Sequence, residues 1–110
     1  MCRWLAYSGA PVFLDEVLFK TDHSLIDQSL SAAESPTTNG DGFGIGWYGI
    51  RDVPGVYKDI RPAWNDTNLQ ALAAQIESSM FLAHVRATTG SPVQRTNCHP
   101  FNYKKWLFVH

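Results

Sequence analysis

Residues 79–90 read Ser-Met-Phe-Leu-Ala-His-Val-Arg-Ala-Thr-Thr-Gly, and the strand they predict organises the rest of the chain. From 79 to 87, small or apolar side chains alternate with a second set that includes His84 and Arg86. This period of two is typical of a β-strand that buries one face. A polar loop is expected to follow from Thr88.

The segments on either side supply both helices and further strands. Strand patterns occur at residues 2–8, 43–50, 55–60 and 106–110. Helical spacing of apolar residues occurs at 13–18, 24–30 and from Asp66 through Ile76. This mixed order of strands and helices indicates an α+β or layered α/β domain.

Local signals set the expected boundaries of these elements. Gly9-Ala10-Pro11 is expected to end the first strand, and the polar run 35–42 is expected to be a turn-rich loop. Ser24 is the expected cap of the second helix. Thr67 and Gln70 have the spacing of a capping box at the start of the third helix.

Glycines alternate along the strand predicted at 43–50. Gly44 and Gly46 fall on one face, which indicates that another backbone or a ligand approaches closely there. Residues 44–49 also spell G-x-G-x-x-G, the dinucleotide fingerprint. That motif needs a strand–turn–helix context, and here it lies within a strand, so a nucleotide site is not predicted.

The composition fits one packed domain. With 110 residues, 45% of them hydrophobic, the chain can bury one core but not two. The net charge is -1 without a basic stripe, which argues against nucleic acid or an anionic membrane as partner. No apolar run approaches the roughly 20 residues that cross a bilayer. The first residues do not form a secretory signal, so a cytoplasmic protein is expected.

The two cysteines are expected to be free thiols in a reducing compartment. Neither Cys2 nor Cys98 has the C-x-x-C or H-x₃₋₅-H spacing of a zinc site, so no metal and no cofactor is predicted.

Cys2 is the candidate nucleophile. Removal of Met1 would leave one residue that carries both a thiol and a free α-amine. An α-amine titrates near pH ~8, so at neutral pH a useful fraction can accept the thiol proton without help from a histidine. The alternative interpretation is a small residue that happens to stand second in the chain.

Arg86 is the candidate substrate cation. An amide substrate with an amino-acid head needs a fixed positive charge for its carboxylate, and the arginine fork can bind both oxygens. The hydroxyls of Thr88 and Thr89 can add hydrogen bonds. Without the rest of the pattern, Arg86 would be a surface arginine and His84 a buried, hydrogen-bonded core histidine.

Four segments together carry a family resemblance: Met-Cys-Arg-Trp-Leu-Ala-Tyr-Ser-Gly at 1–9, Asn-Gly-Asp-Gly-Phe-Gly-Ile-Gly-Trp-Tyr at 39–48, Phe-Leu-Ala-His-Val-Arg-Ala-Thr-Thr-Gly at 81–90 and Asn-Cys-His-Pro-Phe at 97–101. In this order they resemble the class II, N-terminal cysteine, glutamine amidotransferases, specifically the small stand-alone branch. The resemblance implies a four-layer α/β/β/α sandwich of the N-terminal nucleophile hydrolase type. It also implies that glutamine is hydrolysed to glutamate and ammonia through a thioester.

The resemblance also assigns roles to single residues. Cys2 would be the nucleophile and Arg86 would hold the substrate's α-carboxylate. Either Thr88 or Thr89 would supply the hydroxyl contact after it. His99 would lie near the pocket in a structural role.

In the family, the strand that 107–110 matches continues into Asn-Gly, which forms the oxyanion hole, and a later acidic residue binds the α-amine. Residues 1–110 are therefore expected to be the N-terminal part of one domain, with little or no glutaminase activity alone, since one lost oxyanion donor costs about 10²–10³ in rate. Exposed core edges would favour a homo-oligomer or a missing C-terminal half-domain as partner.

Two other functions stay open. Relatives with the same start include an amidase of ergothioneine synthesis, which would make the substrate a larger γ-glutamyl amide cut by the same machinery. The absent oxyanion segment also allows a non-catalytic binding module. The sequence does not indicate an ammonia acceptor.

Overall fold

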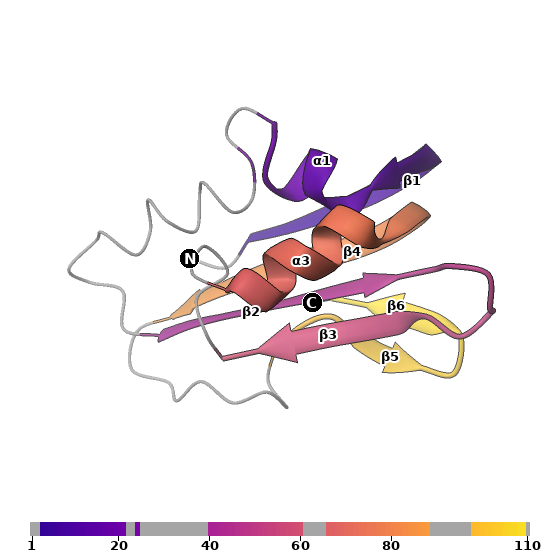
Figure 1. The fold of residues 1–110 in the computed structure, drawn as a ribbon. Helices are drawn as coiled ribbons and strands as arrows, with labels where there is room; N and C mark the ends of the chain where they lie inside the picture. Colours follow the sequence, from indigo (N-terminus) through magenta and orange to yellow (C-terminus); the bar gives the residue numbers. More distant parts are fainter. Residues whose placement is uncertain (1–2, 22–23, 25–39, 61–65, 89–97, 110) are drawn as a thin grey trace.

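The computed structural model describes residues 3–21, 24, 40–60, 66–88 and 98–109. The elements, in chain order, are β1 (Arg3–Phe13), α1 (Leu14–Leu18), β2 (Gly40–Trp47), β3 (Gly55–Asp59), α3 (Thr67–Gln75), β4 (Glu77–Thr88), β5 (Phe101–Tyr103) and β6 (Trp106–Phe108) (Figure 1). Apart from Ser24, the helix predicted at 24–30 lies outside the described residues.

Strand β4 is central in a four-stranded antiparallel sheet of order β1-β4-β2-β3. It pairs with β1 on one side, where Arg3 lies opposite Val85, and with β2 on the other, where Gly42 lies opposite Arg86. The strand predicted at 79–87 is confirmed and extends slightly at both ends.

Strand β1 is longer than its predicted span of 2–8. It runs past Gly9-Ala10-Pro11 to Phe13, with a shift of register between Ser8 and Val12. Since β1 is an edge strand, the missing N–H of Pro11 need not break a ladder bond, and the irregularity accommodates the extra residues. The prediction that this segment ends the strand is therefore wrong.

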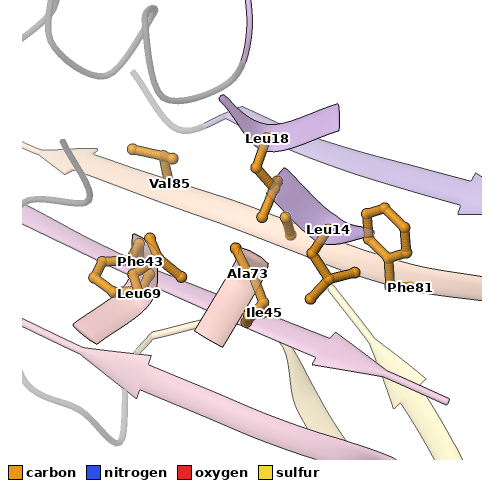
Figure 2. Packing of buried hydrophobic residues seen from close by; sticks show 9 residues of the cluster. Leu14, Leu18, Phe43, Ile45, Leu69, Ala73, Phe81 and Val85 are labelled. Atoms are coloured by element: carbon orange, nitrogen blue, oxygen red, sulfur yellow. The ribbon is translucent and has the colours of Figure 1, made fainter. Parts of the chain in front are cut away.

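Helices α1 and α3 cover one face of the sheet and enclose the core with it (Figures 1 and 2). Apolar side chains from α1, α3, β2 and β4 interlock there because each element presents one apolar face. The core residues are Leu14, Leu18, Phe43, Ile45, Leu69, Ala73, Phe81, Ala83 and Val85. The predicted apolar faces of 66–76 and 79–87 are thus confirmed, and that of 13–18 is confirmed for Leu14 and Leu18, whereas Phe13 ends β1 and is exposed.

Asp66 begins helix α3, and it does so without a Thr67–Gln70 capping box. Its carboxylate accepts hydrogen bonds from the backbone N–H groups of Asn68 and Leu69, at 2.9 and 3.1 Å. An aspartate before the first turn accepts hydrogen bonds from two otherwise unpaired N–H groups. Its negative charge also interacts favourably with the positive N-terminal end of the helix dipole. The hydroxyl of Tyr57 on β3 donates to the same carboxylate at 3.2 Å, which ties α3 to the sheet.

The β5–β6 hairpin lies against the other face of the sheet (Figure 1). A Cβ built on Gly44 would overlap the backbone carbonyl of His99, and one on Gly46 would lie 2.7 Å from the Leu107 side chain. The hydroxyl of Tyr48 accepts from the backbone N–H of Leu107 at 3.1 Å and donates to the carbonyl of Lys105 at 2.5 Å. The predicted close approach to the glycine face is confirmed; the approaching group is backbone at Gly44 and a side chain at Gly46.

The described elements form three layers, namely helices, a four-stranded sheet and a two-stranded hairpin, so the fold is α+β. Strand β2 spans 40–47 where 43–50 is predicted, because Gly40-Asp41-Gly42, placed in a loop by its composition, pairs with 86–88 of β4. Strand β3 matches its prediction closely. In the described part of the chain, none of the helices has the length and apolar character needed to span a membrane.

The packing of β2 against the hairpin layer predicts that alanine substitution destabilises the protein at Gly44 but not at Gly49. Gly44→Ala should lower the free energy of unfolding by about 1–3 kcal/mol, because its methyl group would push into the His99 carbonyl. Gly49→Ala is the matched control, since a Cβ there meets nothing within 4 Å. Urea denaturation of the two variants measures the difference; equal stabilities would contradict this account of the layer contact.

Candidate active site

Arg86 projects from the end of β4 toward the hairpin layer. The alternation along β4 sends Phe81, Ala83 and Val85 into the helix-side core and therefore sends His84 and Arg86 to the opposite face. Arg86 is half-buried. Its partner across the ladder is Gly42.

The ring of His84 meets the ring of His99 across the two layers. Their centroids are 4.4 Å apart with the planes tilted by 56°, and His84 is only 2% exposed. The His99 ring also meets the Phe101 ring in a T-shaped contact, with centroids 4.7 Å apart. The prediction that His84 is a buried core histidine is confirmed, and its contact with His99 gives that residue a structural setting.

Cys98 is a free thiol, fully buried next to His99. Its S–H donates to the backbone carbonyl of Asp59 at 3.6 Å. Burial raises the pKa of the Cys98 thiol above its ordinary value of 9.0, while the positive charges of Arg86 and Lys58 act in the opposite direction and Asp59 adds to the rise. The thiol is therefore neutral and unreactive at pH 7.

A second cation, Lys58, approaches the same segment from β3. Lys58 lies opposite Gly44 in the β2–β3 ladder, and its Nζ is 5.0 Å from the centre of the Phe101 ring. The positive charges of Lys58 and Arg86 both lower the pKa of Cys98. Positive charge on this face of the sheet suits a carboxylate, and the arginine fork can bind it through both oxygens.

The predicted site residues are thus partly accounted for. Arg86 and His99 lie on the same face of the sheet, one from each layer. The backbone of Thr88 pairs with Gly40 at the end of β4, and nothing further is described for it. Thr89 and Cys2 lie outside the described residues.

Lys58 and Phe101 are site neighbours that the sequence analysis misses. The place of Lys58 can be deduced only once β3 is known to pair with β2. In that pairing Lys58 lies opposite Gly44 and points to the same face of the sheet as the glycines. Phe101 belongs to a three-residue strand, too short to be recognised from its pattern. In the described part of the chain, no three His, Cys, Asp or Glu side chains gather where they could hold a metal ion.

An apolar hollow of about 370 Å³ lies further along the same face, toward the start of β4. It is bounded by β1, β4 and β6, with Ala6, Leu82 and Trp106 among its walls. Because it contains no charged side chain, it offers no partner for an amino-acid head group. The end of β4 that carries the positive charge of Arg86 is therefore the better candidate for substrate binding.

The chain matches known proteins over almost its whole length. Residues 18–110 match the family described as class II glutamine amidotransferases. A probable glutamine amidotransferase, DUG3, of Saccharomyces cerevisiae is 40% identical over all of this chain and 34% of its own length. A γ-glutamyl-hercynylcysteine sulfoxide hydrolase of Mycolicibacterium smegmatis is 31% identical over all of this chain and 50% of its own length.

A solved structure has the same fold. A glutamine aminotransferase class-II domain protein from Silicibacter pomeroyi superposes with a TM-score of 0.64 at 34% identity, over 99% of this chain and 35% of that one. The chain thus spans between about a third and a half of the length of these relatives.

The buried thiol predicts how stability changes at alkaline pH. Because the pKa of Cys98 is raised in the folded state, the unfolded chain releases this proton first, and stability that is present below about pH 9 is lost as the pH rises beyond it. We expect the free energy of unfolding of the wild type to fall relative to that of Cys98→Ser between about pH 8 and about pH 10. Urea denaturation at both pH values measures this; parallel behaviour of the two proteins would count against a buried, neutral thiol.

Proposed function

This chain belongs to the class II glutamine amidotransferases, and we propose that its site cleaves the γ-carboxamide of glutamine through a thioester on Cys2. The α-amine of Cys2, freed by removal of Met1, accepts the thiol proton. The sulfur then attacks the carbonyl carbon of the γ-carboxamide, the C–N bond breaks, and ammonia leaves with a proton returned from the amine. Water hydrolyses the thioester to glutamate and restores the thiol.

The observation that carries this proposal is the pairing of β1 with β4. Arg3 lies opposite Val85 in an antiparallel ladder, so the residue before Arg3 is expected beside the residue after Val85. Directly opposed residues in such a ladder have Cα atoms about 5 Å apart and point to the same face. We therefore expect Cys2 beside Arg86, on the face that meets the hairpin layer.

Arg86 is proposed to bind the substrate's α-carboxylate through its fork, with Lys58 adding positive charge to the same site. The hydroxyl of Thr88 or Thr89 is proposed to donate to that carboxylate. His99 is proposed to support the site without transferring protons, with its ring packed against those of His84 and Phe101.

The larger architecture follows the family. We propose that residues 1–110 are the N-terminal part of an α/β/β/α sandwich of the N-terminal nucleophile type, in which further strands and helices extend the β5–β6 layer. The exposed Trp4, Trp106 and Phe108 on or beside that face are consistent with such an extension. The segment after β6 is then proposed to supply the oxyanion hole. We propose a reducing, cytoplasmic location, which the free thiol of Cys98 suits.

A second candidate is hydrolysis of a larger γ-glutamyl amide. The similarity to a γ-glutamyl-hercynylcysteine sulfoxide hydrolase favours it, and the same Cys2 thioester and Arg86 clamp would serve. The two candidates differ only on the leaving-group side. A comparison of kcat/KM for ammonia release from glutamine with kcat/KM for γ-glutamyl amides of bulkier amines decides between them.

Affinity labelling tests the nucleophile. Diazo-oxo-norleucine, a glutamine analogue, should add one adduct to Cys2 of the full-length protein, and intact mass should show that Met1 is absent. Cys2→Ala should abolish both the adduct and turnover. An adduct on Cys98, or labelling that persists in Cys2→Ala, would refute the proposed chemistry.

Substitution of the clamp arginine tests substrate recognition. Arg86→Lys keeps the charge but loses the fork, so we expect KM for glutamine to rise by roughly 10- to 100-fold, as for loss of a charged hydrogen bond worth about 1.5–3 kcal/mol. Arg51→Lys, in an exposed loop, is the matched control and should leave KM unchanged. Equal KM values for the two variants would exclude Arg86 from carboxylate binding.

A further inference from the structure

The contact between His84 and His99 is a direct side-chain link between the sheet and the hairpin layer. The two rings lie 4.4 Å apart, in a region where β2 offers only glycines to the other layer. His84 comes from the middle of β4, where it is enclosed on both sides by paired strands. The His84 ring is therefore fixed by the sheet, and the His99 ring rests on it.

His99 is held from several directions at once. Its ring contacts those of His84 and Phe101, and its backbone carbonyl fits against Gly44, where any side chain would overlap it. Phe101 is itself packed against Phe108 of β6, with ring centroids 5.8 Å apart. Among these supports, His84 is the one on the same strand as the clamp arginine.

The residue before His99 lies within the electrostatic reach of Arg86. The guanidinium charge lowers the pKa of Cys98 against the larger effect of burial, and the Cys98 S–H is anchored to the Asp59 carbonyl. Arg86 follows His84 by two residues on the same face of β4, so residues 98–99, which the His84 ring contacts through His99, lie on the face that carries the guanidinium. We call residues 98–99 the wall.

We propose that His84 is a positioning residue for substrate recognition: its ring supports His99 and so fixes the 98–99 wall that confines the Arg86 guanidinium. The inference rests on the proposed function, since it concerns how Arg86 is held to receive the α-carboxylate. His84 touches neither the substrate nor the reacting sulfur. Loss of its ring leaves a cavity under His99, the wall relaxes into it, and the arginine fork loses its fixed orientation.

The test separates recognition of the amino-acid head from reactivity of the thiol. In the full-length protein, His84→Ala should raise KM for glutamine about tenfold, equivalent to about 1.4 kcal/mol, with a smaller change in kcat. Inactivation by diazo-oxo-norleucine, which needs the same head-group recognition, should slow by a similar factor. Alkylation of Cys2 by iodoacetamide, which needs no head group, should change less than about twofold.

Leu82→Ala is the matched control, because Leu82 lies two residues earlier on the same face of β4 and borders the apolar hollow instead of His99. It removes a partly buried side chain of similar size and should leave KM near the wild-type value. Equal KM values for His84→Ala and Leu82→Ala would overturn the proposal, as would a parallel loss of iodoacetamide reactivity in His84→Ala alone.

Two further measurements keep the test decisive. If His84→Ala fails to fold, Phe101→Leu removes the ring on the other side of His99 and should raise KM in the same way; an unchanged KM there would overturn the proposal. His84→Phe, which keeps a planar ring, should recover part of the lost affinity. A wild-type protein that is not labelled at Cys2 refutes the proposed function itself, whereas normal labelling with no effect of His84→Ala refutes only this inference.

Discussion

The absence of side chains at Gly44 and Gly46 is the constraint on which the arrangement of the two sheet layers depends. Stacked sheets normally lie about 10 Å apart, with side chains filling the space between them. Here the backbone of His99 and the side chain of Leu107 occupy the positions that a Cβ on β2 would take. The hairpin can therefore approach β2 closely, and the segment before it is carried to the end of β4 where Arg86 lies.

The two faces of the sheet hold their neighbours by different means. The helix side is an apolar core in which Phe43, Ile45 and Phe81 are almost completely buried, and its cohesion comes from area removed from water. The hairpin side relies on specific contacts, such as the hydrogen bonds of Tyr48 and the ring contact of His84. Hydrogen bonds and ring contacts depend on the orientation of the groups that make them, so the layer that bears the candidate site is held by directional contacts.

The sequence predicts those features that a local pattern encodes. Strand β4 is recognisable because it has one apolar face and one mixed face. The alternating glycines of β2 predict that another group packs closely against that strand. Features that depend on pairing are not predictable in this way. Gly40-Asp41-Gly42 has the composition of a turn yet extends β2, because β4 offers it a partner, and Lys58 reaches the site only through the register of β3 with β2. The roles of Arg86 and Cys2 come from family resemblance, since spacing alone does not separate a clamp from a surface arginine.

The complete enclosure of Cys98 has a practical consequence for studying this protein. Its sulfur donates to the Asp59 carbonyl and is closed off from solvent. A bulky thiol reagent can reach it only when the structure around it opens. The rate at which that sulfur becomes modified therefore reports how often this part of the chain opens in solution, so the native chain carries its own probe of local opening without any engineered label.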